Sequence, residues 1–319
     1  MVGGGQAGGS TRILLGGSPR ATIESAGHAA MTSSTTTVSI RRITDESASD
    51  AEDLLAVEEP LEIVVAARAP GDARRAERRL GITMRTPGND RELAIGLLFA
   101  EGVISRAADV VAVEEALGPS GDLVRVTLGD DVTVDLGRTE RALAVANASC
   151  GVCGKASIDV AALAPPAPLA RGVPRLAPGV VHGLAARLRG AQPVFGRTGG
   201  LHAAALFDAS GALADLREDV GRHNAVDKLI GAALLAGRLP DPGAVLMVSG
   251  RAGFELVQKA LRASIPVMVA VGAPSSLAAE LASAHGMTLV GFARDGRFNV
   301  YAGRERVEVP VAVPAEAAS

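Results

Sequence analysis

The chain has 319 residues, enough for two domains, and 48% of them are hydrophobic, so a large core can be buried. Aromatic residues account for 2%, with no Trp and one Tyr, and the formal net charge is −3. These values disfavour a base-stacking nucleic-acid module or a broad basic groove. No apolar run approaches the roughly 18 residues that indicate a membrane span.

Residues 1–37 predict a disordered extension, because they are rich in Gly, Ser, Thr and Ala and show no periodicity. Translation could also start at Met31, and the sequence leaves Met1 and Met31 open as the start. The apolar run of this segment, Ile13-Leu14-Leu15, is shorter than the apolar region of a secretory signal. We therefore expect a cytoplasmic protein that has neither nucleic acid nor membrane as a partner.

Residues 38–161 predict a smaller α+β domain. The charged stretch 72–79 is expected to be a solvated surface. Asn89 or Asp90 can cap a helix that ends at Gly102. The expected elements are a strand at Leu61–Val65, a helix at Arg91–Glu101, and strands at Leu123–Leu128 and Asp131–Leu136 joined by the turn Gly129-Asp130.

Residues 162–307 predict an α/β domain, and residues 308–319 a frayed tail. Strands and helices alternate here, which indicates βαβ units; an initial hairpin makes the sheet mixed. The expected order is helix Val180–Leu188, strands Leu201–Phe207 and Leu213–Val220, helix Asn224–Ala236, strand Ala244–Val248, helix Phe254–Ala263, strand Val267–Val271, helix Leu277–His285 and strand Thr288–Phe292.

Both cysteines lie in one short segment, Cys150-Gly-Val-Cys153, with Lys155 close behind. In a reducing compartment such a pair is more often catalytic or metal-binding than a structural disulfide. A neighbouring cation favours the reactive thiolate. The pair therefore fits disulfide exchange, sulfur relay through a persulfide, or half of a zinc site shared by two subunits. Two incidental loop cysteines remain an alternative.

A second polar group is the charge-rich run Arg217–Lys228. His223 and Asp227 are four residues apart and would share one helix face, where they could orient a ligand or transfer a proton. An ordinary capped helix with surface ion pairs explains the same residues. For His202, at the start of a predicted strand, a hydrogen-bonded structural role is the alternative to catalysis.

Three loops follow strands of the alternating region, at Ser249–Arg251, Gly272–Ser276 and Gly291–Arg297. In an open α/β sheet, loops at the carboxyl ends of parallel strands gather ligands. Free backbone N–H groups at helix starts and the side chains of Arg251, Arg294 and Arg297 suit phosphate. These loops predict a phosphate-bearing ligand.

Zinc-dependent nucleobase deaminase chemistry is excluded by the motifs. That chemistry requires a His or Cys followed by x-Glu, together with Pro-Cys-x-x-Cys. Here Ser149 precedes Cys150, and neither His182 nor His202 has the required Glu.

The ordered motifs between residues 83 and 303 resemble those of the formate dehydrogenase accessory sulfurtransferases (FdhD). The segments that carry the resemblance are Arg85–Asp90, Ser149–Lys155, Gly199–His202, Arg217–Lys228, Val248–Arg251, Val271–Ser276 and Gly291–Tyr301.

This resemblance implies a sulfurtransferase that accepts persulfide sulfur from a cysteine desulfurase and passes it to a molybdenum (or tungsten) cofactor bearing two pterin guanine dinucleotides. That cofactor would be a bound substrate for formate dehydrogenase, and no cofactor would be permanently held. The resemblance implies Cys150 as the persulfide cysteine, Cys153 as the second thiol, a homodimer, and a cytidine-deaminase-like C-terminal domain without zinc. The cofactor would contact Phe292, Ala293, Arg294, Asp295, Gly296 and Arg297.

Two other functions fit the residues. A non-catalytic chaperone would bind the cofactor without using its thiols. A thiol-disulfide oxidoreductase would cycle a Cys150–Cys153 disulfide, although Gly154–Ser157 does not clearly start the helix that usually follows such a pair.

Overall fold

The computed structural model describes residues 11–14, 33–72, 74–134, 165, 168–294 and 296–309. The chain divides into two compact units. Unit 1 comprises Met1–Ile158, Gln192–Ala203 and Arg217–Leu239; unit 2 comprises Asp159–Ala191, Ala204–Leu216 and Pro240–Ser319. Among the helices of the described segments, none combines the length and apolar character needed to cross a membrane.

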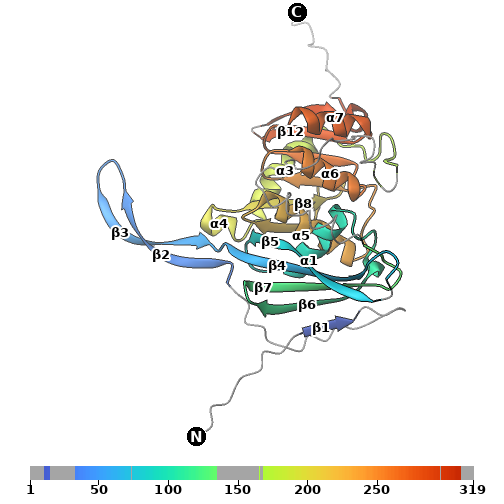
Figure 1. The fold of residues 1–319 in the computed structure, drawn as a ribbon. Helices are drawn as coiled ribbons and strands as arrows, with labels where there is room; N and C mark the ends of the chain where they lie inside the picture. Colours follow the sequence, from blue (N-terminus) through green and yellow to red (C-terminus); the bar gives the residue numbers. More distant parts are fainter. Residues whose placement is uncertain are drawn as a thin grey trace, which may run out of the picture. The chain divides into compact units, whose positions relative to one another are not determined.

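Unit 1 contains a five-stranded sheet in the order β1-β6-β7-β4-β5 (Figure 1). The strands β4 and β7 are parallel, and the other neighbours are antiparallel. Strand β4 is buried along Leu61–Ala67, as its central place and its nearly continuous apolar sequence require. The strands are β1 (Thr11–Leu14), β4 (Glu59–Arg68), β5 (Arg75–Arg85), β6 (Val110–Gly118) and β7 (Gly121–Leu128).

Helix α1 (Asp90–Ala100) contacts β6 and β7, and helix α5 (Arg222–Leu235) packs on α1. Two glycines allow the helix backbones to approach. A Cβ atom at Gly96 would lie 2.6 Å from the carbonyl carbon of Asp227, and one at Gly231 would lie 2.8 Å from that of Glu92. Neither position has room for a side chain, so this helix pair depends on both glycines.

The remaining elements of unit 1 are short or peripheral. The strands β2 (Thr35–Ile43) and β3 (Ala48–Ala56) form a two-stranded antiparallel ribbon that is mostly exposed and contacts helix α4 (Phe195–Thr198). A 3-10 turn, η1 (Ala107–Asp109), precedes β6.

Unit 2 is built on a six-stranded mixed sheet in the order β13-β12-β11-β10-β8-β9. The strands β10, β11 and β12 are parallel and connected through α6 and α7, while β8 runs antiparallel to β10 and β13 antiparallel to β12. The elements are α3 (Pro178–Gly190), β8 (His202–Phe207), β9 (Leu213–Asp219), β10 (Val245–Val248), α6 (Phe254–Arg262), β11 (Val267–Ala270), α7 (Ser276–Ala284), β12 (Thr288–Arg294), β13 (Arg297–Ala302) and η3 (Arg304–Arg306).

Arg306 connects separate segments of unit 2 by side-chain hydrogen bonds. Its side chain is fully buried, and its guanidinium donates to the backbone oxygens of Ala170, Val173 and Gly286 at 2.6–2.7 Å. A fourth bond reaches Thr288 Oγ1 at 3.1 Å. Burial lowers the pKa of Arg306 from its ordinary value, but these acceptors receive hydrogen bonds from four of the five guanidinium N–H donors.

The structure confirms a mixed α/β fold with several sheets and, in the described residues, six α-helices. The mixed sheet and its two parallel βαβ connections were predicted from the alternating pattern. The cytidine-deaminase-like organisation and the domain limits stay predictions.

Several local predictions were wrong. Strand β7 was expected to form a hairpin with a strand beginning at Asp131, but it pairs with the preceding β6. At the described residues 131–134, the only pairing is an isolated bridge between Thr133 and Arg68. The segment expected to be disordered includes β1 and the start of β2. The charged stretch at residues 75–79 is exposed as expected at every position except the half-buried Ala76, but it forms the start of strand β5.

We predict that Gly96→Ala and Gly231→Ala each destabilise unit 1 by about 3 kcal/mol, since the added methyl must push one helix backbone away from the other. Urea denaturation followed by circular dichroism measures the change.

Gly183→Ala is the matched control. It lies inside α3, where a Cβ atom would meet only the flexible Arg187 side chain at 3.7 Å. This substitution should stabilise the protein slightly, because Ala favours helix over Gly. Equal effects of all three substitutions would contradict the close packing of α1 and α5.

Candidate functional site

The predicted catalytic residues Cys150 and Cys153 lie in residues 135–164, which are outside the described residues. The predicted cofactor contact Asp295 is also outside the described residues. The structure places the rest of the predicted cofactor-contact stretch, Phe292–Arg294 with Gly296 and Arg297, where strand β12 turns into β13 in unit 2. Ala293 is buried, whereas Arg294, Gly296 and Arg297 are exposed.

A β-bulge shapes this stretch. Gly291 pairs with Asn299 and Arg294 with Arg297, so Phe292 and Ala293 face the single residue Phe298. The backbone of Phe292 is left-handed, with φ +53°, which is rare for an aromatic residue and costs about 1–3 kcal/mol. Bulges and such strain recur beside binding sites, where they redirect side chains. This geometry supports a functional role for the stretch.

The three loops singled out by their position lie at the carboxyl ends of β10, β11 and β12, as predicted. Backbone hydrogen bonds connect them in series. Gly272 N donates to Gly250 O at 3.0 Å, and Phe292 N donates to Gly272 O at 3.1 Å. A Cβ atom at Gly272 would lie 3.1 Å from Arg251 Cγ, so the first two loops are also closely packed. The strained residue Phe292 is thus held against the neighbouring loop.

Positive charge is exposed along these loops at Arg251, Arg294 and Arg297. In the described part of the chain, Arg251 and Arg297 form no ion pair, so both guanidinium groups can receive an anion. Ser275 caps the next helix, α7, by accepting a bond from Ala278 N at 3.3 Å. The arrangement is suited to a phosphate-bearing ligand.

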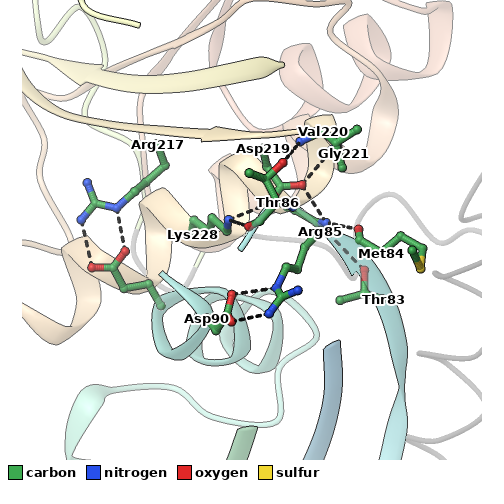
Figure 2. A network of polar contacts seen from close by, with 12 residues as sticks. Thr83, Met84, Arg85, Thr86, Asp90, Arg217, Asp219, Val220, Gly221 and Lys228 are labelled. Atoms are coloured by element: carbon green, nitrogen blue, oxygen red, sulfur yellow. Dashed lines mark hydrogen bonds and ion pairs between the residues drawn. The ribbon is translucent and has the colours of Figure 1, made fainter. Parts of the chain in front are cut away.

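The charged run Arg217–Lys228 forms a buried network in unit 1 (Figure 2). Asp219 and Lys228 are 0% and 1% exposed, and Lys228 Nζ lies 2.7 Å from Asp219 Oδ2. Lys228 also donates to Thr86 O at 2.7 Å, while Asp219 accepts from the backbone N atoms of Thr86 and Gly221. The alternative of surface ion pairs is therefore wrong for this pair.

Two arginines extend the network. Arg85 is fully buried, donates to both carboxylate oxygens of Asp90 at 3.0 and 2.7 Å, and also bonds Asp122 at 2.5 Å. Burial acts to lower the pKa of Arg85, but these two carboxylates outweigh it and the net pKa is raised. Arg217 makes a two-bond contact with Glu92 at 2.6 and 3.0 Å.

Asp90 therefore serves as a partner of Arg85, and the predicted capping of α1 by a side chain was wrong. The N-cap residue is Asn89, whose backbone is left-handed and whose side chain makes no cap hydrogen bond.

The two singled-out histidines lie in unit 1. His223 is in the first turn of α5, and His202 begins β8 and is half-buried. Burial, followed by the charge of Arg222, lowers the pKa of His202 from its ordinary value. The neutral imidazole is thereby favoured at neutral pH, a state that can accept a proton. Its catalytic use stays a prediction.

No group of three or more His, Cys, Asp or Glu residues in the described segments is placed to hold a metal ion. Because both cysteines lie outside those segments, the zinc alternative for the pair is untouched by this observation.

Sequence reasoning missed two further residues near the predicted stretch. Asn299 and Tyr301 are exposed on β13, and Asn299 Nδ2 donates to Tyr301 Oη at 3.4 Å. The signal was the period-two pattern Arg297-x-Asn299-x-Tyr301, in which every second residue is polar or amphipathic.

We predict that Lys228→Met destabilises unit 1 by about 3–5 kcal/mol, because it leaves the buried Asp219 carboxylate without a countercharge. Chemical denaturation measures this loss. Arg41→Met is the control: Arg41 and Asp50 are 3.3 Å apart but strongly exposed, and loss of such a pair should cost less than about 1 kcal/mol. Similar losses for both variants would contradict the importance of burial.

We also predict a pH effect from His202. Since its folded pKa is lowered, the folded chain binds fewer protons than the unfolded chain as pH falls below about 6.5. Stability contributed by the neutral form is present above that pH and is lost in acid. His202→Gln should therefore flatten the fall in melting temperature between about pH 7.5 and 5.5. An unchanged slope would count against the burial of this imidazole.

Comparisons with known proteins identify the same family that the sequence motifs indicate. The model of the FdhD/NarQ family matches residues 56–308. "Sulfur carrier protein FdhD" of Streptomyces coelicolor is 48% identical over 279 residues, covering 85% of this chain and 95% of the relative. The proteins of the same name from Anaeromyxobacter dehalogenans and Mycobacterium tuberculosis are 49% and 46% identical, over 80% of this chain and 88% and 92% of theirs.

A crystal structure described as a putative formate dehydrogenase accessory protein from Desulfotalea psychrophila is also similar. Its TM-score is 0.66 with 26% sequence identity, over 86% of this chain and all of that one. The family match spans most of the chain, and the relatives match it along nearly their whole length. The chain belongs to the FdhD/NarQ family.

Proposed function

We propose that this chain is a sulfur carrier that takes persulfide sulfur from a cysteine desulfurase and transfers it to a bis-(pterin guanine dinucleotide) molybdenum or tungsten cofactor destined for formate dehydrogenase. The observation that carries the proposal is its close similarity, over 80–85% of its length, to relatives named sulfur carrier proteins. The solved neighbour described as a formate dehydrogenase accessory protein supports the same destination.

The first chemical step uses Cys150. Its thiolate attacks the terminal sulfur of the desulfurase persulfide, and a new S–S bond forms at Cys150. The S–S bond of the donor breaks, and its electron pair leaves on the donor cysteine as a thiolate. Lys155 is close in sequence and would favour the attacking thiolate by its charge.

The second step uses Cys153 in the simplest balanced scheme. Its thiolate attacks the inner sulfur at Cys150 and forms a Cys150–Cys153 disulfide, while the terminal sulfur leaves with the electron pair as hydrosulfide. The metal of the cofactor substrate would take up this hydrosulfide in exchange for an oxygen ligand, which would leave as water after protonation. A dithiol reductant returns the disulfide to two thiols and is itself oxidised to a disulfide. The chain thus acts as a sulfurtransferase whose thiols are regenerated.

In this proposal the cofactor binds at the loops of unit 2. Arg251 follows β10 and the bulged stretch ends β12, with β11 between the two strands, and arginine suits the phosphates of a guanine dinucleotide. In this proposal the cofactor is a transient substrate of a homodimer, and the desulfurase and formate dehydrogenase are its protein partners.

We predict that incubation of the protein with a cysteine desulfurase and free cysteine adds one sulfur atom to Cys150, because its thiolate is the acceptor. Intact-protein and peptide mass spectrometry locate the added sulfur. Cys153→Ala should still gain sulfur at Cys150, whereas Cys150→Ala should gain none there and should fail to activate formate dehydrogenase.

The control isolates sulfur transfer from cofactor binding. Arg251→Ala should load sulfur as the wild type does but activate formate dehydrogenase poorly, since loading does not involve the loops of unit 2. If Cys150→Ala and Cys153→Ala both activate the enzyme normally while Arg251→Ala does not, the chain is a cofactor-binding chaperone and the sulfur-carrier proposal is wrong.

A further inference from the structure

The ribbon of β2 and β3 has two outer edges to which no other strand of the described segments is paired. Figure 1 shows this ribbon, in blue, extending away from the five-stranded sheet of the same unit. Its nine residue pairs keep one register without a shift, and a hydrogen bond of 2.8 Å from Thr44 N to Ser47 O closes its turn. A two-stranded ribbon is marginally stable alone in water, so a further strand would stabilise this one.

One face of the ribbon carries apolar side chains that the two strands do not bury. Directly opposite residues of an antiparallel pair point to the same face, so Val38 and Ile40 share a face with Ala51 and Leu55. The first three are half-buried, and Leu55 is 47% exposed. An apolar row beside an unpaired strand edge favours pairing with another strand.

The two outer edges differ in charge. Strand β3 exposes three carboxylates, at Asp50, Glu52 and Asp53, and charged side chains protect a strand edge against pairing. Strand β2 has no carboxylate, and its nine residues include three Thr, one Val and two Ile, which are β-branched and favour strands. The edge of β2 is therefore the one suited to receive another strand.

The sequence of β2 is suited to pairing with itself. Two copies that meet antiparallel around a two-fold axis at Ser39 align all nine residues of each strand. Val38 then lies opposite Ile40 of the second copy, and both arginines of β2 lie opposite threonines, so no like charges face each other. The same arrangement of β3 would set Glu52 against Glu52 of the second copy. Charge thus selects β2 over β3.

We propose that β2 is the surface through which two copies of this chain pair, edge to edge and antiparallel about Ser39, so that their ribbons form one four-stranded sheet. The two apolar rows then become continuous across the axis, because Val38 and Ile40 of the two copies are neighbours. A sheet of three or more strands with an apolar face can be stable where a lone ribbon is marginal. This inference rests on the homodimer of the proposed function and names the surface that forms it.

Cysteine cross-linking tests the axis, because a residue on the axis faces its own copy. Full-length protein with Cys150→Ala and Cys153→Ala contains no other thiol, and Ser39→Cys is added to it. Opposite Cα atoms in an antiparallel pair are about 4.5–5.5 Å apart, within the range of a disulfide. Mild oxidation should therefore link most of the protein into dimers on non-reducing gels. Glu52→Cys, at the position that pairs with Ser39 within the ribbon, is the matched control and should stay monomeric.

A second cross-link tests the register. In the proposed pairing, Thr37 faces Arg41 of the second copy. Thr37→Cys and Arg41→Cys, each in the cysteine-free background, should form little covalent dimer separately and a mixed disulfide when the two proteins are combined. Intact-protein mass spectrometry identifies the mixed species, and equal amounts of all three disulfides would contradict the register.

Charge variants at Ser39 test the equilibrium with the native cysteines in place. Ser39→Glu and Ser39→Lys each set two like charges on the axis, and each should weaken the dimer about fivefold in sedimentation velocity. An equimolar mixture should recover the wild-type dissociation constant, because opposite charges then face each other. Loss of dimer through misfolding of the ribbon would not be recovered by mixing.

The outcomes separate the surface from the function. A chain that stays monomeric, or a dimer in which Ser39→Cys links no better than Glu52→Cys, overturns the proposal. The second result assigns the dimer to another surface and the ribbon to a different partner. Persulfide loading of Cys150 is measured on the wild-type protein. Loading without the cross-link leaves the sulfur-carrier function standing and removes this inference, whereas the cross-link without loading removes the sulfur-carrier function alone.

Discussion

The buried pair of Asp219 and Lys228 fixes the central arrangement of unit 1. Both groups are out of water, so each requires the other together with the backbone atoms of Thr86 and Gly221 to satisfy its charge. Replacing both partners of a buried ion pair by well-packed apolar residues is often neutral for stability, but removing one partner leaves an unpaired buried charge. The pair therefore imposes one geometry on the segments that meet there and penalises every other.

The close packing of α1 and α5 cooperates with this pair. Gly96 and Gly231 bring the two helix backbones together, and Lys228 lies on α5 three residues before Gly231. Arg217 then binds Glu92 on α1, and Arg85 binds Asp90 at the start of the same helix. The charge-rich segments Arg85–Asp90 and Arg217–Lys228 thus supply the polar contacts in the interior of unit 1.

The sequence predicted the βαβ region well, because β10 and β11 are short apolar runs between loops rich in Gly and Ser. The place of the ligand loops followed from that alternation. Strands β5 and β13 were missed because their exposed faces carry charged or polar residues that resemble surface loops. The left-handed Phe292 and the Arg85–Asp122 bond could not be predicted, since the first opposes backbone preference and the second joins distant segments.

Arg306 has a practical consequence for handling the protein. The final described residues beyond it, Val307–Val309, include two exposed positions, but the guanidinium of Arg306 reaches three carbonyl groups inside unit 2. A fragment that stops at Glu305 would lose the buried guanidinium that joins these three backbone oxygens to one another and to Thr288. The shortest fragment that retains an intact unit 2 must therefore keep Arg306.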